Sequence, residues 1–339
     1  MPLLQDLWPR IRGFFAKLFR RKPPEPGRFV ADAKFAWRGF VGVAPWIAPQ
    51  REYMVYVPMG HERRWQWRRR PLVVLLHGCK QKPEEVAGAT RIARFADGEG
   101  LLVLLPRQNA HANAWGCWNW FDGPTSHGWG EAAIVAAQIR EVRRSYRIDK
   151  RRVFVAGLSA GGGLAAIIAL RRPGLVAGVF VHSGIACGAA SSPRTAIDVL
   201  AKGADTDIVR IGREARDNAD KAVLPVPLCV VQGAGDNVVS PVHASQLVRQ
   251  FLALNGHPAG VDAGEALPAP DRTDSAVTPE GRKVTTSEWR IGERLVVRHV
   301  LIDALGHAWS GGDGQFGYTD PNGPDATALL GAFIRDATV

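Results

Sequence analysis

The sequence predicts an α/β fold in which a mostly parallel central sheet is flanked by helices. Short apolar and β-branched runs alternate with longer stretches of helical periodicity, a pattern typical of strands joined by helical crossovers. Several of the apolar runs lead into glycine-containing loops that carry Ser, Asp or His, as expected at the carboxyl ends of parallel strands. With 339 residues, of which 46% are hydrophobic and 22% charged, the chain can bury one large core.

Each element follows from its local pattern. The apolar runs predict strands over residues 51–58, 71–76, 101–105, 153–157, 176–182, 228–232 and 295–302. Helical periodicity predicts helices over residues 84–97, 129–145, 160–171 and 242–254, and a final helix over 325–337. Residues 257–283 are rich in Pro, Gly, Ala and Asp, and we interpret them as a long excursion from the core over the rim of the site.

The most informative motif is Gly157-Leu158-Ser159-Ala160-Gly161, which follows the strand 153–157 and precedes the helix 160–171. Glycines on both sides allow a tight, strained turn from strand to helix, because a Cβ at either position would crowd neighbouring backbone. Such a turn lifts the Ser159 hydroxyl clear of the sheet and points the first helical amides at the same place. Glycine-rich turns also bind phosphates or serve packing, so the motif alone leaves those alternatives open.

Two residues at later strand ends are the partners that Ser159 needs. Asp236 follows the strand 228–232 and His307 follows the strand 295–302, each on a glycine-containing loop. Alone, Asp236 reads as a turn aspartate and His307 as a solvated loop histidine. The order Ser, Asp, His is nevertheless that of the α/β-hydrolase fold, so we predict this fold, with Ser159 as nucleophile, His307 as base and Asp236 as the acid that orients the base.

The loop after the strand 71–76 is His77-Gly78-Cys79, and it lies where an α/β-hydrolase places its second oxyanion amide. We therefore assign the backbone amides of Cys79 and Ala160 to an oxyanion hole. A histidine before a glycine more often holds a loop through a backbone hydrogen bond than transfers protons, and we interpret His77 in this way.

Several segments together carry a family resemblance. They are His77-Gly78-Cys79, Cys117-Trp118-Asn119-Trp120-Phe121, Gly157-Leu158-Ser159-Ala160-Gly161-Gly162, Gly306-His307-Ala308-Trp309-Ser310-Gly311-Gly312, Tyr318-Thr319-Asp320-Pro321 and Gly323-Pro324-Asp325-Ala326. The chain resembles the poly(3-hydroxybutyrate) depolymerase family of esterases over roughly residues 50–338. The resemblance implies the same roles for Ser159, Asp236, His307 and the Cys79 amide.

The predicted function is hydrolysis of carboxylic esters, with short-chain polyhydroxyalkanoate esters, polymers or oligomers of 3-hydroxybutyrate, as the expected substrate. The resembled family also includes feruloyl and acetyl-xylan esterases, so a carbohydrate esterase is the alternative. A basic surface-binding protein that merely keeps a hydrolase fold is a non-enzymatic alternative, which the complete triad disfavours. The mechanism needs no cofactor, and no cluster with metal-ligand spacing predicts a metal.

The four cysteines do not form a disulfide-dense scaffold. Cys229 lies in an apolar strand and is expected to be a buried thiol. Cys79 and Cys117 fall on loops near the expected site, and a disulfide between them would tie the oxyanion loop to the tryptophan loop. An oxidising compartment would conflict with the lack of a recognisable signal peptide, but we favour the bridge.

Aromatic residues gather in the loops around the expected site. Trp118, Asn119, Trp120 and Trp309 are candidates for substrate binding, with the indoles as walls of an apolar cleft and Asn119 as a polar contact. The alternative is that some of the tryptophans belong to the core, as most do in a domain of this size.

The net charge of +11 and the pI near 9.9 raise the question of a nucleic-acid partner. The basic residues cluster in two places without a recognition fold, so no nucleic-acid partner is expected. One cluster, Arg63, Arg64, Arg68, Arg69 and Arg70, flanks two tryptophans and reads as a solvated loop. The other cluster belongs to the N-terminal segment.

We divide the chain into a basic amphipathic helix with a Pro-rich linker, residues 1–27, and an α/β-hydrolase domain, residues 28–339. Apolar residues recur every three or four positions in 1–22, between basic ones, and no signal-peptide core or membrane span is recognisable. We expect this helix to bind an anionic membrane or a polyester granule; packing against the core is the alternative. The expected location is cytoplasmic or peripheral to such a surface, although the resembled family is often secreted.

Overall fold

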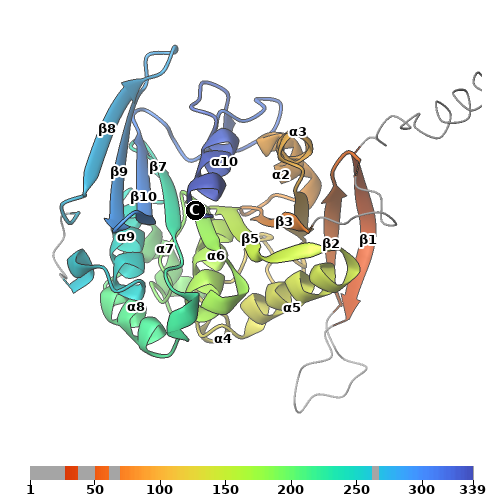
Figure 1. The fold of residues 1–339 in the computed structure, drawn as a ribbon, viewed down its shortest axis with the longest axis horizontal. Helices are drawn as coiled ribbons and strands as arrows, with labels where there is room; N and C mark the ends of the chain where they lie inside the picture. Colours follow the sequence, from red (N-terminus) through yellow and green to blue (C-terminus); the bar gives the residue numbers. More distant parts are fainter. Residues whose placement is uncertain (1–26, 37–49, 61–68, 262–266, 339) are drawn as a thin grey trace, which may run out of the picture.

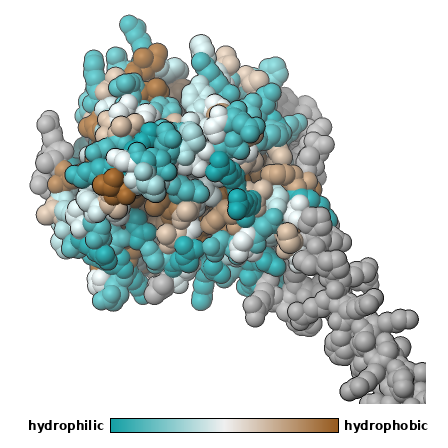
Figure 2. Space-filling model, turned by 90° about the horizontal axis from the view of Figure 1, so that it is seen from above, coloured by the Kyte–Doolittle hydropathy of each residue, from teal (hydrophilic) through white to brown (hydrophobic). Residues whose placement is uncertain are grey.

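The computed structural model describes residues 27–36, 50–60, 69–261 and 267–338. The helix expected over residues 1–22 and most of the arginine-rich cluster lie outside the described residues. In the described part of the chain, no helix is both long and apolar enough to cross a membrane. The face shown in Figure 2 is mainly hydrophilic, with small scattered apolar areas.

One large sheet organises the molecule (Figure 1). Its strand order is β1-β2-β4-β3-β5-β6-β7-β10-β9-β8, and the strands from β4 through β3, β5, β6 and β7 to β10 pair in parallel. The bounds of these strands are Arg28–Ala36 (β1), Gln50–Val57 (β2), Arg70–Leu76 (β3), Leu102–Pro106 (β4), Ile148–Leu158 (β5), Gly178–His182 (β6), Leu228–Gly233 (β7), Arg272–Val277 (β8), Lys283–Ile291 (β9) and Arg294–Ile302 (β10). A separate two-stranded sheet consists of Trp309–Ser310 (β11) and Thr319–Asp320 (β12).

Helices cover both faces of the large sheet (Figure 1). Their bounds are Pro83–Thr90 (α2), Ile92–Glu99 (α3), Gly123–Ser126 (α4), Gly130–Ser145 (α5), Ala160–Arg171 (α6), Pro193–Lys202 (α7), Ile208–Asp217 (α8), Val242–Leu254 (α9) and Ala326–Asp336 (α10). Helices α5, α6, α8 and α9 share one hydrophobic core, whereas α2, α3 and α10 share the other. The predicted α/β arrangement is therefore confirmed.

The central strand β3 shows why both faces must be covered. Leu72, Val74 and Leu76 point into the core shared with α5 and α6, whereas Val73 and Leu75 point into the core shared with α2 and α10. All five side chains are completely buried, as expected for a parallel strand between two helical layers. The carboxyl end of β3 is thereby fixed, together with the loop that follows it.

Two expectations about secondary structure are wrong in part. The helix expected over 84–97 is two helices, because Arg91 adopts a left-handed backbone conformation with φ 52° between α2 and α3. The excursion expected over 257–283 instead contains β8, which pairs with β9 and extends the sheet as an antiparallel hairpin. All six residues of β8 are exposed, so this strand lacks the apolar alternation that marks a half-buried strand.

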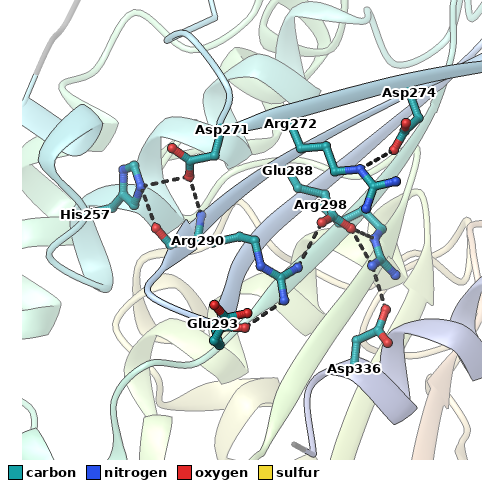
Figure 3. Close-up of polar contacts among 9 residues, drawn as sticks. All are labelled: His257, Asp271, Arg272, Asp274, Glu288, Arg290, Glu293, Arg298 and Asp336. Atoms are coloured by element: carbon teal, nitrogen blue, oxygen red, sulfur yellow. Dashed lines mark hydrogen bonds and ion pairs between the residues drawn. The ribbon is translucent and has the colours of Figure 1, made fainter.

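An ion-pair network fastens this edge of the sheet to the C-terminal helix (Figure 3). Glu288 on β9 accepts hydrogen bonds from Arg290, at 2.9 Å, and from Arg298 on β10, at 2.7 Å through Nε. Arg298 also donates to Asp336 of α10 at 2.6 Å. Because Glu288 and Arg298 are nearly buried, each charge depends on its partner for stabilisation.

Candidate active site

Ser159 occupies the tight turn between β5 and α6. Its backbone has φ 57° and ψ −123°, a strained conformation for a residue with a Cβ. A Cβ on Gly161 would lie 2.5 Å from the carbonyl oxygen of His77, and one on Gly157 would lie 2.7 Å from the nitrogen of Gly162. The predicted crowding of neighbouring backbone by a Cβ at Gly157 or Gly161 is thus confirmed, and no larger residue fits at either position.

The sheet brings the three candidate catalytic residues together at the carboxyl ends of its parallel strands. Ser159 follows β5, Asp236 follows β7 and His307 follows β10, and these strands run parallel with β6 between β5 and β7. The two later loops are also bonded to each other, since the amide of Gly235 donates to the carbonyl of Leu305 at 3.0 Å. The positions of Asp236 and His307 are therefore coupled through backbone as well as side chains.

Asp236 and His307 form a hydrogen-bonded pair. Nδ1 of His307 lies 2.8 Å from Oδ2 of Asp236, and the other carboxylate oxygen accepts the amides of Val238 and Val239 at 2.9 and 2.8 Å. Burial alone would raise the pKa of Asp236, but the bonds from His307 and the two amides outweigh it, so the pKa lies below its ordinary value. A carboxylate in this state holds the imidazole in one orientation and stabilises its protonated form.

The loop after β3 packs against the Ser159 turn. A Cβ on Gly78 would lie 3.6 Å from the Cβ of Ser159. The amide of Gly78 donates to Gln81 Oε1 at 2.8 Å and that of Lys80 donates to the Trp115 carbonyl at 2.9 Å. Within the described residues, we find no acceptor for the amide of Cys79, which lies between these two bonded amides.

The second candidate oxyanion donor is the amide of Ala160. It is the first residue of α6, and the first amides of a helix have no acceptor inside the helix. An oxyanion at this place would also be favoured by the positive end of the helix dipole. The assignment of the Cys79 and Ala160 amides to an oxyanion hole therefore remains a proposal.

His77 and the two loop cysteines hold this region together. Nδ1 of His77 donates to the carbonyl of Gly78 at 2.8 Å and Nε2 accepts the amide of Gln108 at 3.2 Å. Burial lowers the pKa of His77 to about 4, so the ring is neutral and structural, as expected. A disulfide joins Cys79 to Cys117, which confirms the favoured bridge.

The tryptophans expected to contact substrate lie in the core. Trp118, Trp120 and Trp309 are 2%, 5% and 1% exposed. The Trp118 indole donates to the His77 carbonyl at 3.1 Å, and Trp120 lies against the position where a Cβ would stand on Gly163. This burial contradicts their expected role as cleft walls and supports the alternative that they belong to the core.

Asn119 likewise serves its own loop. Its side-chain amide donates to Glu131 at 2.8 Å and to the carbonyl of Ala112 at 3.2 Å, while its oxygen accepts from Asn113 at 2.8 Å. Glu131 also accepts from Gln108 at 2.5 Å. Burial raises the pKa of Glu131, although these hydrogen bonds oppose the rise. The Asn119 amide thus has no donor left for substrate.

Sequence reasoning missed His182, which is hydrogen-bonded both to Ser159 and to the loop that carries His307. Its carbonyl accepts the amide of Ser159 at 2.9 Å, and its ring Nε2 accepts the amide of Ser310 at 3.2 Å. Burial, together with the nearby charge of His307, lowers its pKa to about 3. The signal in the sequence was a histidine at the end of an apolar strand, which alone is weak.

Comparison with known proteins identifies the family. A family model described as esterase PHB depolymerase matches residues 51–277, more than half of the chain. The chain belongs to this family. Among the described residues, no group of three or more His, Cys, Asp and Glu side chains is arranged to hold a metal ion.

Named relatives show the range of this similarity. The chain is 30% identical over 188 residues to poly(3-hydroxyalkanoate) depolymerase C of Paucimonas lemoignei, a match that covers 55% of this chain and 45% of the relative. It is 27% identical over 194 residues to feruloyl esterase B of Neurospora crassa, covering 55% of this chain and 65% of the relative. The matches therefore span less than two thirds of either relative.

A solved structure agrees on the fold. The acetyl xylan esterase from Aspergillus awamori aligns with a TM-score of 0.62 at 19% identity, covering 83% of this chain and 93% of that chain. Similarity at this level of identity is informative about architecture. The predicted α/β-hydrolase fold is confirmed.

Proposed function

We propose that the chain is a serine esterase with Ser159 as nucleophile, His307 as general base and Asp236 as the residue that orients the base. The observation that carries this proposal is the 2.8 Å bond between His307 Nδ1 and Asp236, at the sheet edge where Ser159 also lies. Family membership supports the reaction class.

The reaction proceeds in two acyl-transfer steps. Nε2 of His307 takes the proton of the Ser159 hydroxyl while the serine oxygen attacks the ester carbonyl. The amides of Cys79 and Ala160 stabilise the tetrahedral oxyanion, and the same histidine returns its proton to the leaving alcohol. Water, deprotonated by His307, then attacks the acyl-enzyme and releases the acid. No step calls for a cofactor.

The proposed substrates are short hydroxyalkanoate esters, with 3-hydroxybutyrate oligomers or polymer as the leading class. The name of the Paucimonas lemoignei relative favours this class. The names of the Neurospora crassa relative and of the aligned structure favour the second candidate, a carbohydrate esterase acting on feruloyl or acetyl groups. A cavity lined by Lys80, Lys82 and Trp115 fits an oligomer that carries a free carboxylate better than it fits a feruloyl or acetyl ester.

Substitution of the triad tests the reaction. Ser159→Ala and His307→Ala should each lower turnover of p-nitrophenyl butyrate by several orders of magnitude, whereas Asp236→Asn should retain more activity. Circular dichroism should show that each variant stays folded. Wild-type turnover in folded Ser159→Ala would show that another group is the nucleophile.

A panel of esters tests the substrate. The panel contains 3-hydroxybutyrate oligomers, amorphous polyester, methyl ferulate and acetylated xylan, and initial rates are compared at equal enzyme concentration. Hydroxybutyrate oligomers should lead the ranking. A clear preference for methyl ferulate or acetylated xylan would establish the carbohydrate esterase instead.

We also propose, from sequence alone, that residues 1–22 bind an anionic membrane or polyester granule. Apolar and basic residues in one helical period are typical of an interfacial helix. Removal of residues 1–26 should leave soluble-ester turnover nearly unchanged and abolish sedimentation with anionic liposomes. Unfolding of the shortened chain would instead show that this helix packs on the core.

A further inference from the structure

A cavity of about 570 Å³ lies beside the oxyanion loop. Its walls are residues 80–82, residues 107–111, residues 114–116 and Glu52. Neither Ser159 nor the other triad residues line it. The cavity is therefore distinct from the proposed triad, and the mechanism above does not use it.

The cavity is nevertheless close to the site of reaction. Lys80, in its wall, directly follows Cys79, the proposed oxyanion donor. One residue earlier, a Cβ on Gly78 would lie 3.6 Å from the Cβ of Ser159. The short loop of residues 78–80 therefore joins the Ser159 turn to the wall of the cavity.

The walls of the cavity are fixed before any ligand arrives. The disulfide between Cys79 and Cys117 ties its two wall segments, and the amide of Lys80 donates to the Trp115 carbonyl at 2.9 Å. Asn113 Oδ1 accepts the amides of Trp115 and Cys117 at 2.9 and 3.3 Å. A wall held in this way loses little conformational entropy when a ligand binds.

Trp115 presents an exposed aromatic face on this fixed loop. Its side chain is 65% exposed, in contrast to the buried tryptophans nearby. The ammonium group of Lys80 lies 5.0 Å from the centre of its ring. A rigid indole next to a cation offers one surface for an aliphatic segment and, beside it, a charge for an anion.

The net charge around the cavity is positive. Arg107 pairs with Glu52, at 3.4 Å, and with Glu84, so these three groups together carry one negative charge, against which Lys80 and Lys82 supply two positive charges. In the part of the chain that the structure describes, neither Lys80 nor Lys82 makes an ion pair within 4.0 Å. Two ammonium groups are thus free to bind an anionic group, and no carboxylate of the described chain competes for them at that distance.

We propose that this cavity binds the free carboxylate of a short hydroxy-acid oligomer, with the adjoining aliphatic carbons against Trp115. This inference rests on the proposed esterase function and specifies its substrate. In a linear oligomer of hydroxy acids, the free carboxylate always lies on the alcohol side of each ester bond. The cavity is therefore the leaving-group subsite, and the enzyme removes hydroxy acids from the carboxyl end of the oligomer.

The atoms balance in this assignment. Attack by Ser159 breaks the bond between the ester carbonyl and the oxygen of the terminal hydroxy acid. That oxygen receives the proton from His307 and leaves as an alcohol whose carboxylate is held by Lys80 and Lys82. The rest of the oligomer stays on Ser159 as an acyl group until water hydrolyses it.

Binding to the catalytically disabled Ser159→Ala protein tests the cavity directly. Calorimetry compares the 3-hydroxybutyrate trimer acid with its methyl ester, which lacks the negative charge and carries one additional methyl group. The acid should bind about fivefold more tightly at low salt, and the preference should fall as salt rises. Lys82→Gln, made in the Ser159→Ala protein, should lower the ratio to about twofold, because Lys80 still attracts the carboxylate, and Trp115→Leu should weaken both ligands.

Lys150→Gln is the matched control, because Lys150 is an exposed lysine at the opposite end of β5 and should leave the ratio unchanged. Equal affinity for acid and methyl ester, an unaltered ratio in Lys82→Gln, or no binding of either compound would overturn the inference. Hydrolysis by the intact enzyme is read separately. If p-nitrophenyl butyrate is hydrolysed and the oligomers are not, yet the acid binds in a Lys82-dependent way, the cavity assignment stands and the proposed substrate falls.

Discussion

His299 provides a test of how buried histidines limit stability in acid. It lies on β10, is 6% exposed, and its Nε2 is buried without a hydrogen-bond partner among the described residues. Burial lowers its pKa to about 4. His77 and His182 are buried in the same way, with pKa values of about 4 and about 3.

The sign and size of the effect follow from proton linkage. The pKa of each histidine is lower in the folded state than the ordinary value near 6.5 of the unfolded chain, so between these values the unfolded chain binds more protons. The free energy of unfolding therefore has its full value, as far as these histidines are concerned, above about pH 6.5. It decreases as the pH falls toward the pKa of the folded state. At about pH 5 each histidine costs about 2 kcal/mol relative to about pH 8, or about 6 kcal/mol for the three.

That loss is large compared with a typical free energy of unfolding of about 5–15 kcal/mol. The depressed pKa of Asp236 does not contribute in this range, because its stabilisation is present above the ordinary carboxyl pKa and is lost only at lower pH. Replacement of His299 by leucine should remove about one third of the loss that these three histidines cause between about pH 8 and about pH 5.

The assay is equilibrium unfolding in urea, followed by tryptophan fluorescence at about pH 8 and about pH 5. The free energy of unfolding should fall by about 2 kcal/mol less in His299→Leu than in the wild type. His111→Gln, at an exposed histidine, is the control and should keep the wild-type difference. An identical pH dependence in His299→Leu and wild type would refute the argument that burial sets this pKa.

Three further substitutions probe contacts around the site and the sheet edge. Gly161→Ala places a methyl group against the His77 carbonyl and should destabilise the chain by about 3 kcal/mol in urea unfolding; a loss below about 1 kcal/mol would show that the turn relaxes around the methyl group. His182→Gln removes the ring acceptor of the Ser310 amide and should lower kcat roughly tenfold to a hundredfold with KM little changed; an unaltered kcat would mean that His182 does not position the site. Glu288→Gln removes the carboxylate charge that compensates the nearly buried Arg298 and should lower the free energy of unfolding by about 3 kcal/mol. A decrease in Tm of less than about 1 °C would contradict this expectation.

The sequence was sufficient to predict those elements whose pattern lies within one short segment of the chain. The helix expected over 160–171 and that expected over 242–254 match α6 and α9, because apolar periodicity and glycine or proline boundaries operate within one helix. The loops after β5, β7 and β10 could be placed together because parallel strands end at one edge of a sheet. The contact between Asp236 and His307 is the result of that rule.

The sequence was insufficient where burial depends on distant contacts. Trp118 and Trp120 lie in a segment with loop composition, and their burial arises from packing on the His77 loop and on Gly163. The role of Asn119 depends on Glu131, which is twelve residues away and on another element. β8 has no apolar alternation at all, so only its pairing with β9 reveals it as a strand.

The burial of these tryptophans also decides where specificity can reside. An indole without exposed surface affects the fold, so Trp118→Ala should cost about 3–5 kcal/mol in urea unfolding and lower activity on all esters alike. Trp115 is exposed on a loop held by the disulfide, so Trp115→Leu should leave stability within about 0.5 kcal/mol and change the ratio of kcat/KM between oligomer acid and p-nitrophenyl butyrate. If Trp115→Leu lowered both substrates equally, the choice of substrate would have to be made on the other side of Ser159, by groups that contact the acyl chain.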